Sequence, residues 1–88
     1  MKLGKESLYA IDGLVVLAKN PIGTTMQLRD LANTARIPQN FLAKTFQKLS
    51  RANIVATSRG AIPGGALVRR ANAINLKDIF LAVGVSHL

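Results

Sequence analysis

The chain has 88 residues, with twelve Lys and Arg against four Asp and Glu, which gives a formal net charge of +8. Hydrophobic residues make up 49% of it, and this excludes a disordered basic tail, which would lack the apolar surface that offsets chain entropy. With no cysteine and one His, the chain offers no disulfide framework, thiolate zinc site, cysteine-held iron–sulfur cluster or multi-histidine metal site. We therefore expect a single domain over residues 1–88 without a cofactor, and a polyanionic partner: DNA, RNA or, less favoured, an anionic membrane surface.

Two helices are predicted in the first part of the chain. Apolar residues recur at helical spacing over residues 6–18, and the Pro and Gly of segment 20–23 end that helix. Its apolar residues are Leu8, Ile11, Leu14, Val15 and Ala18. A shorter helix is expected over residues 28–35, with Thr24 and Thr25 available as caps. Its apolar residues are Leu28, Leu31, Ala32 and Ala35.

A third helix is predicted to begin at Pro38, whose fixed φ suits the first helical position, and to run to Arg51. One face is apolar and carries Phe41, Leu42, Phe46 and Leu49. The other face carries Gln39, Asn40, Ala43, Lys44, Gln47, Lys48 and Arg51. This helix and the previous one meet across a turn of about four residues, which is the spacing of a helix-turn-helix motif. Ala32, Ile37 and Leu42 would close its small core.

A β-hairpin is predicted next, with strands over residues 54–58 and 66–69. The turn between them is rich in Gly and Pro, and Gly64 and Gly65 are expected to provide positive φ there. Beyond the hairpin, Asn75 can cap a last helix. Asp78 favours the positive end of that helix, and Gly84 would end it.

The predicted order is therefore helix, helix, tight turn, helix, β-hairpin, helix. This is a mainly α fold with a small β-hairpin, and it predicts a winged helix-turn-helix. The helix-turn-helix would cover residues 27–51, the wing 54–70 and the final helix 76–83.

Basic residues are concentrated in the second half of this arrangement. Between Leu31 and Lys77 the charged residues are Arg36, Lys44, Lys48, Arg51, Arg59, Arg69, Arg70 and Lys77, without one acid. A solvated basic surface with no partner would also fit, but soluble faces usually mix both signs. The pattern therefore favours phosphate contacts by the third helix and the hairpin.

The residue types on the third helix predict how it would contact DNA. Gln39 and Asn40 carry amides that can bond adenine bidentately, and Ala43 offers a methyl group to thymine. Lys44, Lys48 and Arg51 are placed to anchor phosphates. In the wing, Arg59, followed by Gly60, could enter a minor groove, although a solvent-facing cation is the simpler alternative.

Other functional classes find little support in the sequence. Ser7 and Tyr9 have no nearby base, and His87 reads as a solvated terminal residue, so no enzyme activity is predicted. The longest apolar runs are far shorter than the roughly 20 residues of a membrane span. Acids interrupt the segment after the basic start, where a secretory signal would be apolar. The expected location is the bacterial cytoplasm.

Several residue groups resemble the Rrf2 family of bacterial winged-helix transcription regulators, from Met1 to about Gly84. The matching groups are Met1-Lys2-Leu3, Tyr9-Ala10, Leu17-Ala18, Leu28-Arg29-Asp30-Leu31-Ala32, Ile37-Pro38, Phe41-Leu42, Leu49, Val55, Arg59-Gly60, Gly64-Gly65 and Ile74-Asn75-Leu76-Lys77-Asp78-Ile79. The resemblance implies a winged-helix fold, double-stranded DNA as partner and a homodimer. It places the base-reading residues on Asn40, Ala43 and Arg59.

The chain also departs from the family's pattern. Some members have glutamate at position 43 to read cytosine, which Ala43 cannot do. Arg36 stands where glycine is frequent, so a left-handed residue there would cost roughly 1 kcal/mol. The wing is one residue longer and lacks the usual tyrosine. The family's cysteine-bearing sensor loop and long dimerisation helix are missing. Three explanations are open: the sensor was lost, the chain is a fragment, or this member never used a sensor.

Three hypotheses follow from these patterns. The first is a sequence-specific repressor or activator with its third helix in the major groove and its wing in the minor groove. The second is an architectural protein that binds nucleic acid without reading bases. The third is a winged-helix module that binds another protein. Dimer contacts would come from the first or the last helix.

Overall fold

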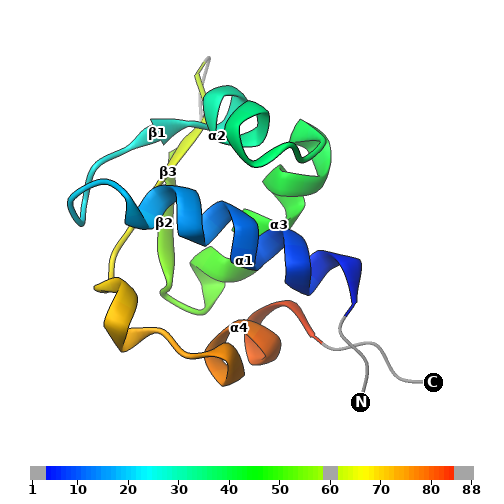
Figure 1. Ribbon diagram of the computed structural model, residues 1–88, viewed down its shortest axis with the longest axis vertical. Helices are drawn as coiled ribbons and strands as arrows, with labels where there is room; N and C mark the ends of the chain where they lie inside the picture. The colour runs from blue at the N-terminus through cyan, green and yellow to red at the C-terminus, as the bar shows by residue number, and fades with distance from the viewer. Residues whose placement is uncertain (1–3, 59–61, 85–88) are drawn as a thin grey trace.

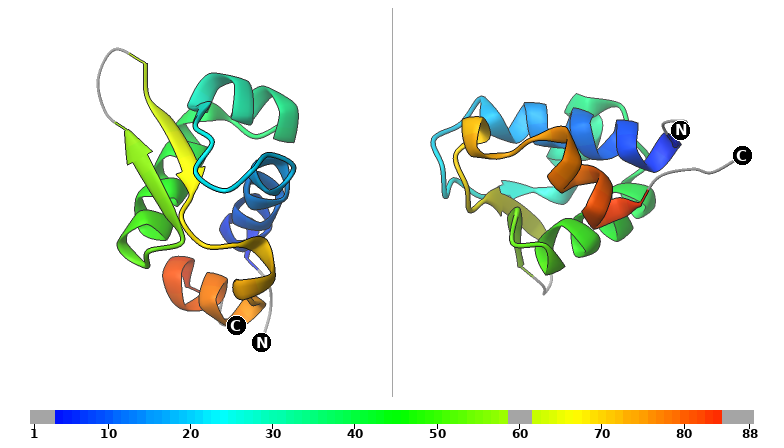
Figure 2. Two further views of the ribbon diagram at one scale, coloured as in Figure 1. Left: turned by 90° about the vertical axis from the view of Figure 1, so that its left-hand side faces the viewer. Right: turned by 90° about the horizontal axis from the view of Figure 1, so that it is seen from below.

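The computed structural model describes residues 4–58 and 62–84, and within them the chain forms four α-helices, a short 3-10 helix and a three-stranded antiparallel sheet (Figure 1). The elements are α1 (Lys5–Ala18), β1 (Met26–Gln27), α2 (Leu28–Ala35), α3 (Gln39–Arg51), β2 (Val55–Ser58), β3 (Gly64–Leu67), η1 (Ala71–Ala73) and α4 (Leu76–Val83). Helix α1 lies between α2 and α4, and β2 and β3 run side by side along one edge of the helices (Figure 2). The expected winged helix-turn-helix is confirmed.

The buried face of α1 differs from the predicted one. Leu8 and Val15 are 47% and 53% exposed, while the core receives Ala10, Leu14 and Leu17 together with Ser7 and Gly13. A Cβ added at Gly13 would lie 3.1 Å from the Phe46 ring, so the small residues let α3 approach α1 closely. The predicted Leu14 is in the core, and Ile11 packs against it. Because Ala and Gly add little hydrophobicity, the apolar spacing did not reveal the small residues of the buried face, and it included the exposed Leu8 and Val15.

The helix-turn-helix has the predicted core, but its first helix has another N-cap residue and its second helix begins one residue later than predicted. Ala32, Ile37 and Leu42 are all at most 5% exposed. Helix α2 is capped by Gln27 rather than by Thr24 or Thr25, because the chain first pairs as β1 in the sheet. Pro38 has an extended ψ of 132° and is the N-cap of α3, so this helix begins at Gln39, one residue later than predicted.

The turn between α2 and α3 depends on one left-handed residue. Arg36 has φ 58° and ψ 49° at the C-cap of α2. Its backbone N–H bonds to carbonyl oxygens of the last turn of α2, as a left-handed cap does. The left-handed turn residue expected from the sequence is therefore confirmed.

The sheet has a strand that the sequence did not predict, and its glycines have a different role. Strand order is β1-β3-β2, with Met26 opposite Gly65 and Gln27 opposite Gly64. The last strand covers 64–67 rather than 66–69, and neither glycine has positive φ. A Cβ on Gly64 would lie 2.7 Å from the Met26 carbonyl oxygen, and one on Gly65 would lie 2.9 Å from the Phe46 ring. Both glycines therefore permit close packing against β1 and α3.

Helix α4 begins and ends as predicted. The Asp78 backbone N–H donates to Asn75 Oδ1 at 2.9 Å, and the Asn75 backbone N–H donates to Asp78 Oδ2 at 3.2 Å, which completes a capping box. Gly84 ends the helix with φ 86°.

Phe41 of α3 was expected in the core but is 45% exposed, and its ring packs edge-on against Tyr9. None of the helices in the described ranges is long and apolar enough to cross a membrane.

Candidate nucleic-acid interface

Helix α3 has one buried side and one polar side. Leu42, Thr45, Phe46 and Leu49 are at most 1% exposed. The buried Thr45 hydroxyl donates to the Phe41 carbonyl oxygen at 3.0 Å, so this hydroxyl has a hydrogen-bond partner within the helix. Because successive residues turn by about 100°, the opposite side carries the exposed residues Asn40, Lys44, Gln47 and Arg51. We call these four residues the outer stripe of α3; it contains no acid.

The predicted base-reading residues lie at the start of this helix. Gln39 and Asn40 occupy its first turn and are exposed. Ala43 is half-buried, and it lines a hollow of about 90 Å³ with Gln47 of α3 and with Thr57 and other residues of the sheet and its turn. The amides therefore extend into solvent, whereas the Ala43 methyl group lies near the junction of α3 with the sheet.

The three basic residues predicted as phosphate anchors have different surroundings. Lys44 and Arg51 are exposed, and no ion pair is formed by either within residues 4–58 and 62–84. Lys48 is half-buried, and its Nζ donates to Oε1 of Glu6 on α1 at 2.7 Å. The sequence analysis missed this partner because the two residues are 42 positions apart.

A second basic residue of the acid-free segment is also bound inside the fold. The Arg69 guanidinium donates to the carbonyl oxygens of Ala52 and Asn53 at 2.8 and 3.0 Å, where α3 ends. It also pairs with Asp78 of α4 at 3.5 Å. Arg69 therefore satisfies carbonyl groups at the C-terminal end of α3. The segment contains no acid in the sequence, but the fold places Glu6 and Asp78 beside two of its cations.

The two residues predicted for the tip of the wing, Arg59 and Gly60, lie outside the described residues. Within the described residues, a hollow of about 320 Å³ opens between the start of α2, the start of α3 and residues 62–63. It is lined by Gln27, Arg29, Gln39, Ile62 and Pro63. The Arg29 side chain donates to Gln27 Oε1 at 3.3 Å and pairs with the neighbouring Asp30 at 3.5 Å. The sequence pattern predicted no functional role for Gln27 or Arg29, although both lie at the start of a helix-turn-helix.

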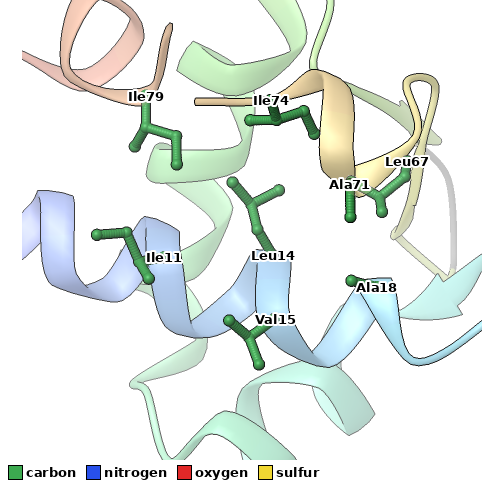
Figure 3. A pocket seen from close by; sticks show the side chains of 8 residues that line it. All are labelled: Ile11, Leu14, Val15, Ala18, Leu67, Ala71, Ile74 and Ile79. Atoms are coloured by element: carbon green, nitrogen blue, oxygen red, sulfur yellow. The ribbon is translucent and has the colours of Figure 1, made fainter. Parts of the chain in front are cut away.

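A second surface feature is apolar and includes no residue of α3. A hollow of about 140 Å³ lies between α1 and the chain around η1 and α4, and its lining side chains are drawn in Figure 3. It is lined by Ile11, Leu14, Val15, Ala18, Leu67, Ala71, Ile74 and Ile79. All eight side chains are hydrocarbon, so this hollow has no group that could bind phosphate or a metal ion. On α1 and α4, Leu8, Leu76 and Leu81 are 47%, 56% and 76% exposed.

Comparison with protein families matches residues 3–87 to the model described as "Rrf2: Iron-dependent Transcriptional regulator". Among curated proteins, "Protein aau3" of Rhizobium meliloti (strain 1021) is 34% identical over 79 residues. That match covers 90% of the chain and 51% of the relative, so the chain spans about half the length of this relative.

Solved structures with the same fold include two CymR proteins and one IscR protein. The global cysteine regulator CymR (YrzC) of B. subtilis has a TM-score of 0.81 at 26% identity, over all of the chain and 72% of CymR. Staphylococcus aureus CymR in its oxidized form has a TM-score of 0.82 at 25% identity, over 99% of the chain and 71% of that protein. T. potens IscR has a TM-score of 0.74 at 23% identity, over 94% of the chain and 61% of IscR, a likeness of fold alone.

Proposed function

The chain belongs to the Rrf2 family of transcriptional regulators, and from this membership we propose that it binds double-stranded DNA sequence-specifically to regulate transcription. The observation that carries the proposal is the outer stripe of α3. Two amide and two cationic side chains lie exposed on one side of the helix, while its opposite side is buried. Amides that can bond base edges beside cations that can bond phosphates form the side-chain set of a recognition helix.

In this proposal the first turn of α3 enters the major groove. Gln39 and Asn40 contact base edges, with adenine as the preferred partner of their amides. Lys44 and Arg51 contact phosphates, and Ala43 contacts a thymine methyl group. The wing, with Arg59 and Gly60 at its tip, contacts the adjacent minor groove. Arg29 is a further candidate phosphate contact, because it lies on the hollow between the wing and Gln39.

We also propose that two copies of the protein bind two half-sites. Leu8 and Val15 of α1, with Leu76 and Leu81 of α4, are large apolar residues that this fold leaves about half exposed or more. Burying such residues against a second copy would remove apolar surface from water. A dimer of this kind would read a palindromic site.

The family description names iron, but the residues of this chain do not fit an iron site. The sequence has no cysteine, and among the described residues no three His, Asp or Glu side chains lie together. We therefore propose that DNA binding by this chain needs no metal ion of its own. Treating the protein with a chelator should leave its DNA affinity unchanged, and a loss of affinity would contradict this.

Selection of bound duplexes from a random library tests the proposed function. A recovered motif with two inverted half-sites, rich in A·T pairs at the positions read by α3, is the expected outcome. Equal recovery of all duplexes at low salt would favour an architectural protein that holds phosphates without reading bases. No recovery at any salt concentration would favour a protein-interaction module.

A further inference from the structure

The ion pair between Lys48 and Glu6 joins the proposed recognition helix α3 to α1. Its Nζ–Oε1 distance of 2.7 Å is that of a charge-assisted hydrogen bond. The Lys48 side chain is 42% exposed and the Glu6 side chain 27% exposed, so salt screens this pair less than it screens fully exposed charges. The pair therefore competes with other partners of Lys48 under ordinary buffer conditions.

Lys48 lies at the border between two sides of α3. At 100° per residue it is about 40° around the helix from Lys44 and about 60° from Arg51, both cations of the outer stripe. It is only about 20° from Phe41, whose ring packs on Tyr9 of α1 with centroids 5.7 Å apart. A flexible lysine at this border can reach a phosphate beside the outer stripe or a carboxylate on α1. The position of Glu6 decides between them.

The first turn of α1, which carries Glu6, is held in place by two contacts. First turns of helices tend to fray, because their N–H groups lack intrahelical partners. Here the hydroxyl of Ser7, which is 1% exposed, donates to the Gly84 carbonyl oxygen at the end of α4 at 3.0 Å. Tyr9 packs against Phe41. The Glu6 carboxylate is therefore fixed beside α3.

We propose that Glu6 is a positioning residue that holds Lys48 away from DNA and so limits the affinity of this protein for its site. The inference rests on the proposed function. The carboxylate keeps the Lys48 ammonium on the α1 side of α3, and it also repels phosphates that approach this border. The protein then binds DNA with one phosphate contact fewer than the cations of α3 offer.

The first test is Glu6→Gln, which keeps the shape of the side chain and removes its charge. Affinity for a duplex is expected to rise about three- to tenfold near 100 mM salt, and the slope of log K against log salt should steepen by about 0.9, the value for one added phosphate contact. Asp12→Asn is the matched control, because it removes an equal charge from an exposed residue of α1 that has no ion pair in the described structure. It should leave the slope unchanged.

The second test removes the lysine in two backgrounds. In the wild-type protein, Lys48→Ala should change affinity less than about twofold, whereas in Glu6→Gln it should abolish both the gain in affinity and the steeper slope. Lys44→Ala shows how much affinity and salt slope are lost when a cation that contacts phosphate is removed. Thermal unfolding confirms that each variant is folded at the assay temperature. If Glu6→Gln is not, Glu6→Asp replaces it; its shorter carboxylate loosens the pair and should give a smaller rise with the same dependence on Lys48.

The outcomes separate this inference from the proposed function. An equal loss on Lys48→Ala and Lys44→Ala in the wild-type background would show that Lys48 already contacts phosphate and would overturn the inference. So would an unchanged salt slope in Glu6→Gln. If the wild-type protein binds no duplex even at low salt, the proposed function fails, and the inference fails with it.

Discussion

The outer stripe of α3 and the apolar surface of α1 and α4 are built from opposite kinds of residue. The outer stripe has amides and cations and no acid, and it includes no large apolar side chain. The apolar surface exposes Leu8, Val15, Leu76 and Leu81, and acids lie on the same two helices. The difference teaches that the outer stripe carries two cations and no acid, whereas α1 and α4 carry charges of both signs, which the net charge of +8 for the whole chain does not reveal. The outer stripe therefore favours a polyanion as partner, and the apolar surface favours another apolar surface.

The largest expected effect comes from removing the cations of the outer stripe. The double variant Lys44→Ala/Arg51→Ala should weaken DNA binding about ten- to a hundredfold and flatten the salt slope by about 1.8, because two phosphate contacts are lost. Fluorescence anisotropy over a salt series measures both quantities. The control is Lys5→Ala/Lys19→Ala on the α1 side, with the same change in charge. A similar loss in both double variants would show that only net charge matters.

Next in size is the loss of base reading. Asn40→Ala should cost about 1 to 3 kcal/mol in discrimination between the selected site and a random duplex, while affinity for the random duplex stays nearly constant. Competition binding with the two duplexes gives this value. Asn33→Ala makes the same change at an exposed position of α2 and should leave discrimination intact. Unaltered discrimination in Asn40→Ala would favour an architectural protein.

Charges placed on the apolar surface should affect assembly rather than folding. Val15→Glu/Leu81→Glu is expected to give a monomer that binds one half-site, because a buried carboxylate opposes association. The free energy of unfolding should change by no more than about 0.5 kcal/mol per site, since both residues are exposed. Analytical ultracentrifugation follows the assembly. A wild-type protein that is already monomeric on its palindromic site would contradict the proposed dimer.

The smallest effect concerns the turn that sets the angle between α2 and α3. Arg36→Gly should stabilise the protein by about 0.5 to 1 kcal/mol, because glycine adopts the left-handed conformation without the Cβ penalty. Urea unfolding measures the gain. Ala35→Gly, one residue earlier and still helical, should instead destabilise by about 1 kcal/mol. A loss of stability in Arg36→Gly would show that the arginine side chain itself stabilises the turn.

Features that depend on neighbouring residues could be predicted from the sequence. The Asn75–Asp78 capping box and the end of α4 at Gly84 follow from a few adjacent positions. The left-handed Arg36 was instead expected from the family resemblance, because glycine is frequent at that position. The exposed polar side of α3 also follows, because its helical period is complete within the helix. The sequence is therefore a good guide wherever the deciding contact is local.

Features that depend on distant residues could not be predicted. The two-residue β1 becomes a strand only because Gly64 and Gly65 offer it a close partner. The core side of α1 is marked by small residues that matter because of Phe46 in another helix. In the same way, the sequence predicts Lys48 as a phosphate anchor, and only the structure shows that Glu6 lies beside it. The candidate site was therefore located by sequence, but the partners of its cations were not.

The central claim is that DNA contacts the outer stripe of α3 and not the apolar surface of α1 and α4. Backbone amide NMR spectra recorded while the selected duplex is added test it residue by residue. The account predicts that the largest shifts lie in residues 39–51 and in the wing, with small shifts around Leu8 and Val15. Shifts that centre on α1 and α4, with α3 unaffected, would contradict it.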